Sequence, residues 1–242
     1  MALYGEQEYQ LRLGDFDRYN RLQPAAILDI FQDIATIQAN ASGMGRDDMM
    51  AKGVFWIVTR TKYRMLSDPA FHSTVIASTW PHTPTRFSFL RDYRLTSTDG
   101  VVIAEGTSEW LLMEAETRKF ASVLDHYEGS TDFVEDRTFD PKPRKIAQLP
   151  DENAPSLVVV PPYTDVDLNG HVNNARYANY AIAALDPGAD GAIGTFQIDY
   201  RQEVREGEQL SVRYQTIDGC PIMAGYDSDN NVMFACRIEP RL

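Results

Sequence analysis

The chain has 242 residues, of which 43% are apolar, and a formal net charge of -12 at pH 7. This length suffices for one large domain or two smaller ones with buried cores, and the negative charge disfavours nucleic acid as a partner. The two cysteines, Cys220 and Cys236, are too few for a disulfide framework, and no apolar run is long enough to cross a bilayer. We therefore expect a soluble, cytoplasmic protein that makes no use of a membrane.

The first half predicts one long helix followed by four strands. A short strand is expected at 9–13, and a helix at 22–41, where Ala, Ile, Leu and Phe recur at helical spacing. Pro24 suits the first helical turn and Gly43 suits the stop. The four strands after this helix are separated by Pro, Gly and Asp residues. They are predicted at 54–65, 74–80, 87–96 and 101–113.

The same succession of elements then repeats. Residues 129–155 are polar and proline-rich, so we expect a linker with little regular structure. After it come a predicted strand at 157–160, a helix at 172–185, and strands at 192–200, 209–216, 222–226 and 232–238.

Residues match between the two halves as well. Asp15-Phe16-Asp17, followed by Leu22, stands 150 positions before Asp165-Val166-Asp167, followed by Val172. An internal duplication explains both this match and the repeated order of elements. We therefore predict an α+β fold of two tandem hotdog domains, at 1–128 and 156–242, each an antiparallel sheet wrapped around a long helix.

The densest cluster of polar side chains runs from Asp165 to Asn174, between a proline-broken strand and a helix. Loops at such places commonly carry binding residues. The N–H groups and the dipole of the helix start suit a polarised carbonyl oxygen, so an oxyanion site is predicted there. In the alternative interpretation, Asp167 or Asn169 only caps the helix and His171 is a surface residue.

A calcium-binding loop is a second alternative for this segment. Four residues match positions 1, 3, 5 and 6 of an EF-hand loop: Asp165, Asp167, Asn169 and Gly170. Position 12 requires a bidentate glutamate but is Arg176, and Val-Val-Val-Pro-Pro precedes the loop in place of an entering helix. The sequence therefore disfavours calcium.

The segment Asp167-x-Asn169-x-His171-Val172-Asn173-Asn174, followed by Tyr177, resembles the active-site segment of the acyl-acyl-carrier-protein thioesterases of plants and bacteria. Tyr200-Arg201-Gln202-Glu203 is similar to that family's Tyr-Arg-x-Glu. Three segments of the first half also resemble the family pattern: Thr79-Trp80, Arg86-Phe87-x-Phe89-x-Arg91-Asp92-Tyr93, and Thr107-Ser108-x-Trp110 with Thr117-Arg118-Lys119. The resemblance spans most of the chain.

The resemblance implies a double-hotdog thioesterase with Asp167, Asn169, His171 and Glu203 as the catalytic set. Plant members have a cysteine after the glutamate, whereas this chain has Val204, which offers no nucleophile. Attack by water is therefore favoured, with Glu203, helped by His171, as the base, Asn169 positioning water or carbonyl, and Asp167 orienting its neighbours. No cofactor or metal is required for this chemistry.

The first half lacks the same polar groups. At the 150-residue offset, Tyr19 stands in place of Asn169 and Arg21 in place of His171. We therefore expect one active site per chain, with the first half helping to hold the acyl chain, as the resemblance also implies. Candidate pocket residues of the first helix, for which core packing is the alternative role, are Ile27, Phe31 and Ile34.

A carrier protein is the expected partner. Strand alternation places Arg60, Lys62 and Arg64 on one face, and Arg118-Lys119 and the run 142–145 supply further positive charge. Any of these patches could receive the acidic acyl carrier protein or simply be solvated. An acyl-coenzyme A thioesterase of the same fold and a non-catalytic acyl-binding protein are the alternative functions. The sequence leaves open the preferred acyl chain length and the choice between monomer and homodimer.

Overall fold

The structure is a computed structural model that describes residues 3–188 and 191–241. Residues 1–2, 189–190 and 242 of the two predicted domains lie outside the described residues. The chain divides into two compact units: unit 1 is Met1–Leu13 with Asp29–Pro143, and unit 2 is Gly14–Leu28 with Arg144–Leu242. Residues 14–28, predicted in the first domain, thus belong to unit 2, and the predicted linker 129–155 is divided between the two units after Pro143. The predicted domain limits themselves stay a prediction.

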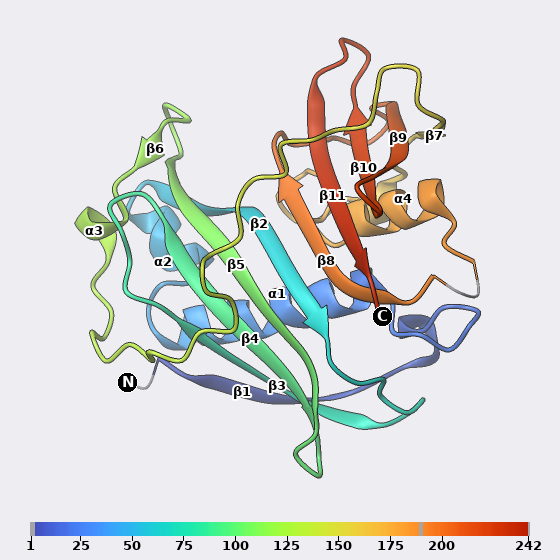
Figure 1. Cartoon of the computed structure of the whole chain (residues 1–242). Coiled ribbons are helices and arrows are strands. Elements are labelled where there is room, and N and C mark those ends of the chain that lie inside the picture. The colour runs from blue at the N-terminus through green and yellow to red at the C-terminus, as the bar shows by residue number, and fades with distance from the viewer. Residues whose placement is uncertain (1–2, 189–190, 242) are drawn as a thin grey trace. The chain divides into compact units, whose positions relative to one another are not determined.

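Unit 1 contains an antiparallel sheet and most of a long helix, α1 (Pro24–Ala41), whose residues from Asp29 on lie against one face of this sheet (Figure 1). The contact is close. Phe31 stacks on Tyr93 with ring centroids 4.3 Å apart, and a Cβ at Gly106 would lie 2.2 Å from the Phe31 ring. Only glycine therefore fits at 106. The strand order is β1 (Gly5–Gln10), β3 (Thr74–Pro81), β4 (Phe89–Ser97), β5 (Val102–Glu114), β2 (Val54–Met65).

The sequence predicts most of unit 1 correctly. Helix α1 begins at Pro24, and Gly43 follows it at a φ of 70°. The strand predicted at 9–13 is wrong by several residues: its pairing with β3 runs from Gly5 to Gln10, and Leu13 already belongs to a 3-10 turn, η1 (Leu13–Asp15). Three elements too short for a periodic signal were not predicted. They are α2 (Arg46–Ala51), β6 (Phe120–Ala121) and α3 (Val123–His126).

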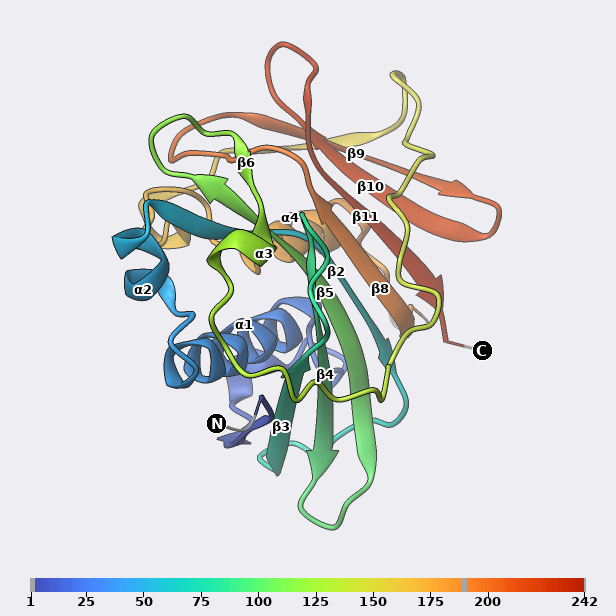
Figure 2. The same ribbon diagram turned by 90° about the vertical axis from the view of Figure 1, so that its left-hand side faces the viewer.

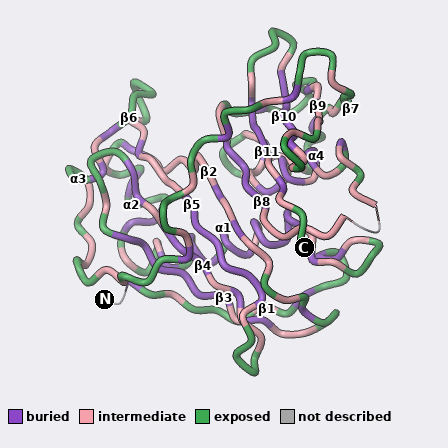
Figure 3. Tube along the Cα trace, in the orientation of Figure 1, coloured by how far each residue is buried: buried purple, intermediate pink, exposed green. Residues whose placement is uncertain are grey.

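Unit 2 repeats the design with a shorter helix, α4 (Arg176–Leu185), packed on its sheet. The inward side chains of this sheet include Phe196, Val212, Met223 and Phe234, all fully buried. Figure 3 shows such buried segments in purple and the exposed turns in green. The strand order is β8 (Ile193–Tyr200), β11 (Val232–Pro240), β10 (Cys220–Tyr226), β9 (Leu210–Ile217), β7 (Ser156–Val159).

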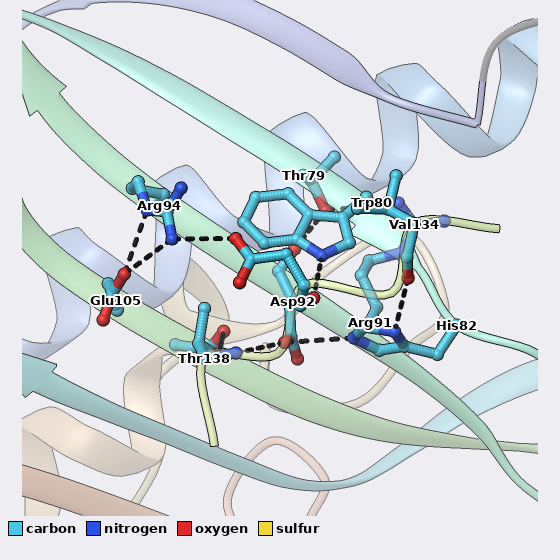
Figure 4. A network of polar contacts seen from close by, with 11 residues as sticks. Thr79, Trp80, His82, Arg91, Asp92, Arg94, Glu105, Val134 and Thr138 are labelled. Carbon is cyan, nitrogen blue, oxygen red and sulfur yellow. Dashed lines mark hydrogen bonds and ion pairs between the residues drawn. The ribbon is translucent and has the colours of Figure 1, made fainter. Parts of the chain in front are cut away.

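The predicted linker contains no helix or strand over 129–155, yet it is fastened to the sheets. In unit 1 the Thr138 N–H donates to Asp92 Oδ2 at 2.7 Å, and the Trp80 indole N–H donates to the Asp136 carbonyl at 2.8 Å (Figure 4). In unit 2 the Ile146 N–H donates to Asp199 Oδ2 at 2.7 Å. Hydrogen bonds from backbone N–H groups to the buried carboxylates of Asp92 and Asp199 therefore hold this segment on the sheet of each unit.

Both units match the predicted fold class. Each has a meander of antiparallel strands and one helix on a face of its sheet, which is the hotdog arrangement (Figure 2). Among the described residues, no helix is long and apolar enough to span a membrane.

Candidate active site

The candidate site is built on a tight loop of unit 2 between the 3-10 turn η2 (Tyr163–Asp165) and α4. Val166 and Val172 form an isolated β-bridge, and the Asp167 N–H donates to the His171 carbonyl at 3.0 Å. Gly170 donates to the Asp167 carbonyl and has a φ of 78°, a conformation that suits glycine. These bonds fix the backbone that carries three of the four predicted catalytic residues.

Asp167 organises this loop. Its Oδ1 accepts the N–H of Asn169 at 2.8 Å, so the carboxylate closes a turn on its own backbone. The orienting role of Asp167 in catalysis stays a prediction. The alternative in which Asp167 or Asn169 caps the helix is wrong, because α4 begins only at Arg176. The side chain that accepts a backbone N–H next to the helix start is that of Asn173, which accepts the Ala175 N–H at 3.0 Å.

His171 and Glu203, predicted from separate segments, are in direct contact. His171 Nε2 lies 3.1 Å from Glu203 Oε2, and their side chains are 22% and 40% exposed. A partly exposed imidazole beside a carboxylate forms a pair that can bind water and exchange protons with it. Of the predicted set, the structure thus joins His171 to Glu203 directly and joins Asn169 to Asp167 through the loop.

Val204 holds the two segments together. Its carbonyl accepts the Val172 N–H at 2.8 Å, and its own N–H donates to the Tyr177 hydroxyl at 3.1 Å. The Val204 side chain is fully buried, whereas that of Glu203 next to it reaches solvent. The bond to Val172 also explains why the helix predicted from residue 172 starts four residues later.

Tyr177 is a residue of the site that the predicted catalytic set omits. Burial raises the pKa of its phenol far above the ordinary value, and the nearby carboxylates of Glu203 and Asp167 raise it further. The phenol therefore stays protonated at any working pH. Its place after the Asn173-Asn174 pair was visible in the sequence, but nothing local indicated which backbone N–H its hydroxyl would meet.

The oxyanion site predicted at the helix start has fewer donors than expected. The Ala175 N–H is bonded to the Asn173 side chain and the Arg176 N–H to the Asn173 carbonyl at 2.9 Å. Two of the N–H groups at the start of α4 are therefore already used within the turn.

The equivalent loop of the first half carries different side chains. Arg21, in the place of His171, turns back onto Asp17, with its Nε donating to Asp17 Oδ2 at 2.8 Å. Tyr19, in the place of Asn169, lies beside this guanidinium, whose carbon is 4.8 Å from the ring centroid. This loop has an ion pair where the other has an imidazole beside a carboxylate.

The candidate pocket residues of α1 are core residues. Ile27 and Ile34 are fully buried and Phe31 is 2% exposed. Phe31 also packs edge-on against Tyr63, with centroids 6.4 Å apart. Core packing, the alternative role, accounts for these contacts, and a part in holding the acyl chain stays a prediction.

The basic face predicted on β2 is present but largely paired. Arg60 lies 3.0 Å from Glu109, and Arg64 lies 2.7 Å from Glu105, both of which are on the neighbouring strand β5. The Lys62 ammonium lies 5.3 Å from the centroid of the Phe139 ring. These carboxylates reduce the positive field of the face, and its role in docking a carrier stays a prediction.

In the described part of the chain, no group of three or more His, Cys, Asp or Glu is placed so that it could hold a metal ion. Asp165, the first residue of the rejected calcium loop, accepts the hydroxyl hydrogen of Tyr180 at 2.5 Å.

Two family models match the chain. The acyl-ACP thioesterase N-terminal domain matches residues 3–129, and the acyl-ACP thioesterase C-terminal domain matches residues 150–239. The structure is similar to the acyl-ACP thioesterase of Bacteroides thetaiotaomicron, with a TM-score of 0.88 at 20% identity over 98% of this chain and 99% of that one. It is also similar to the 12:0-ACP thioesterase of Umbellularia californica, with a TM-score of 0.87 at 21% identity over 100% and 98% of the two chains.

Relatives found by sequence comparison point to the same family as the two domain models. The chain is 25% identical to the acyl-[acyl-carrier-protein] hydrolase FATB2 of Cuphea viscosissima over 76% of this chain and 46% of the relative. It is 24% identical to the palmitoyl-acyl carrier protein thioesterase of Arabidopsis thaliana over 91% of this chain and 57% of the relative. The chain thus spans about half the length of these chloroplastic relatives. With both domain models matched along nearly its whole length, the chain belongs to the acyl-ACP thioesterase family.

Proposed function

We propose that this protein hydrolyses the thioester of fatty acyl-acyl carrier protein and releases a free fatty acid. The observation that carries the proposal is the contact of His171 with Glu203 at 3.1 Å, beside the loop of Asp167 and Asn169. Family membership supports the choice of reaction, and the names of the relatives support an acyl carrier protein as the partner that presents the substrate.

In the proposed mechanism, Glu203 takes a proton from water as the water oxygen bonds to the thioester carbonyl carbon. Asn169 positions the water or the carbonyl, and His171 shares the proton that Glu203 receives. The carbon–sulfur bond then breaks, the fatty acid keeps the water oxygen, and the sulfur leaves as a thiol after taking up the proton. General acid–base catalysis of this kind contributes about 10²–10⁴ in rate.

Water, rather than a protein thiol, is the proposed nucleophile. Val204 occupies the position after the glutamate, and its side chain is fully buried while Glu203 faces solvent. The two cysteines offer no replacement, because neither Cys220 nor Cys236 lies in the loop or beside Glu203 in the sequence, and Cys236 is buried. Burial raises the pKa of the Cys236 thiol well above its ordinary value, which disfavours the thiolate.

The test is fatty-acid release by the purified protein from a panel of acyl-carrier-protein thioesters and the matching coenzyme A thioesters. We expect turnover of the carrier thioesters, and a fall in kcat of about 10²–10⁴ in Glu203→Ala with the circular dichroism spectrum unchanged. Glu206→Ala, which removes an exposed carboxylate from the same loop, is the matched control and should retain full activity. Full activity of the Glu203→Ala variant would refute the assignment.

The same panel separates the alternative functions. Equal or faster turnover of coenzyme A thioesters would make the protein an acyl-coenzyme A thioesterase, which uses the same hydrolytic site. Binding of acyl chains without release of fatty acid would make it an acyl-binding protein. Cytoplasmic location stays part of the proposal and is tested by cell fractionation.

A further inference from the structure

Tyr177 lies at a junction of the site. It is the second residue of α4, and its hydroxyl oxygen accepts the N–H of Val204 at 3.1 Å. That N–H belongs to the peptide bond that joins Glu203 to Val204. The carbonyl of Val204 in turn accepts the N–H of Val172, the residue after His171. The backbone of the carboxylate is therefore held on one side by α4 and on the other by the histidine loop.

The ring of Tyr177 is itself held in place. Three aromatic rings meet it edge-on or nearly so: Phe234 at a centroid distance of 5.2 Å, Tyr200 at 5.8 Å and Tyr180 at 6.2 Å. The side chain is 3% exposed. Because the ring is tightly packed and a tyrosine side chain has few rotatable bonds, the hydroxyl oxygen has a nearly fixed position.

A fixed acceptor at this point bears directly on the contact of His171 with Glu203. A catalytic group displaced by about 1 Å can lose about 10² in rate, and functional side chains are held in position by the residues behind them. Without the hydroxyl, the Val204 N–H would be buried without this acceptor, and the peptide could rotate to find another. Rotation there would move the Glu203 side chain, which is attached one bond away.

We propose that Tyr177 is a positioning residue, which holds Glu203 against His171 through the hydrogen bond from the Val204 N–H to its hydroxyl. The proposal rests on the proposed function, since it assumes that Glu203 acts in thioester hydrolysis. The proposed role differs from packing. The ring alone would fill the space between α4 and the sheet, whereas the hydroxyl is needed only to accept the Val204 N–H.

Tyr177→Phe tests the proposal because it keeps the ring and removes only the hydroxyl. We expect kcat for the thioester to fall about 10-fold to 100-fold while KM changes little. Amide hydrogen exchange at Val204 should become faster, because its N–H loses its acceptor. One lost hydrogen bond is small beside the stability of an ordinary domain, so the variant should fold and lose a few degrees of Tm.

The matched control is Tyr93→Phe in unit 1. The Tyr93 hydroxyl is 2.8 Å from the Ser108 hydroxyl, and the side chain is as deeply buried as that of Tyr177. This variant should lose a similar amount of Tm and keep the kcat of the wild type. A purely structural role of Tyr177 would make the two variants behave alike.

A double-mutant cycle with Glu203→Ala tests whether Tyr177 acts through the carboxylate. If it does, Tyr177→Phe lowers kcat in the wild type but has no further effect in the Glu203→Ala background. Equal fold losses in both backgrounds, or an unchanged kcat with a lower Tm, would overturn the proposal. A wild-type protein that cleaves no thioester would instead refute the proposed function, and the inference with it. The rate of the wild-type protein tests the function. The effect of Tyr177→Phe on kcat, compared between the wild-type and Glu203→Ala backgrounds, tests the role of Tyr177.

Discussion

Two loops of unit 2, residues 15–23 and 165–173, have the same backbone and different side chains. Each contains an isolated bridge, Phe16 with Leu22 in one and Val166 with Val172 in the other. In both, the aspartate N–H donates to the carbonyl four residues on, at 2.9 and 3.0 Å. In both, the aspartate Oδ1 accepts the N–H two residues on at 2.8 Å. The matches all occur at the 150-residue offset.

The two loops differ in the side chains that come after the shared aspartate. The first loop places Tyr19 and Arg21 where the second places Asn169 and His171. Arg21 also donates to the carbonyl of Gly188 at 2.9 Å, so its side chain is used in structural bonds. The comparison teaches that the aspartate and the turn maintain the backbone, and that the proposed chemistry depends on two side chains and on Glu203.

The largest effect should come from giving the second loop the side chains of the first. In the double variant Asn169→Tyr with His171→Arg, an arginine can pair with Asp167 as Arg21 pairs with Asp17. We expect kcat/KM for the carrier thioester to fall by a factor of about 10²–10⁴, because the pair of His171 and Glu203 that we propose to handle the proton is lost. The Tm should change by only a few degrees, since the backbone accepts these residues in the first loop.

The reciprocal variant, Tyr19→Asn with Arg21→His, is the control. It should gain no activity and leave the wild-type rate unchanged, because Glu203, the proposed base, already contacts His171. A double variant at 169 and 171 that kept more than about a tenth of the activity would show that the chemistry resides elsewhere.

The sequence predicted the elements that depend on local pattern. Helical spacing marked α1, proline marked its start, and alternation marked the long strands. The duplication was visible because aspartate and apolar residues recur at a constant offset. The start of α4 was predicted too early, because Val172 resembles a helical residue locally but is bonded to Val204, which is distant in the sequence.

The sequence predicted which residues belong to the site, but it did not predict which of them contact one another. Resemblance supplied the four predicted catalytic residues, but only folding brings His171 to Glu203 and Tyr177 to the Val204 N–H. The basic face of β2 shows the same limit. Alternation correctly placed its cations on one face, but strand register decides that Glu105 and Glu109 stand opposite Arg64 and Arg60.

A smaller effect is expected from the ion pair that distinguishes the first loop. Although partial burial acts to raise the pKa of Asp17, hydrogen bonds from Arg21 and Tyr19 and the charge of Arg21 outweigh it, and the pKa is lowered from 3.8. A carboxylate whose pKa is lower in the folded state stabilises the fold above the unfolded pKa, and this stabilisation is lost as the pH falls through the folded pKa.

Asp17→Asn should therefore cost at most about 1 kcal/mol at pH 7, since the pair is partly exposed and screened. The difference from the wild type should shrink as the pH falls below about 4. Denaturant unfolding of both proteins between pH 3 and 7 measures it, with Asp132→Asn, an exposed carboxylate, as control. A difference that stayed constant across this range would rule out the ionised pair as its source.

An effect of similar size, and a smaller difference between two variants, concerns the residue at the tip of each loop. Gly170 has a φ of 78°, and its counterpart Asn20 has a φ of 60°, so both lie in the left-handed region. A Cβ at Gly170 would meet no atom within 4 Å, so a substitution there strains only the backbone. Because asparagine tolerates this conformation better than alanine, Gly170→Ala should cost about 1 kcal/mol and Gly170→Asn less. Equal free energies of unfolding for the two variants would show that the loops do not share this conformational requirement.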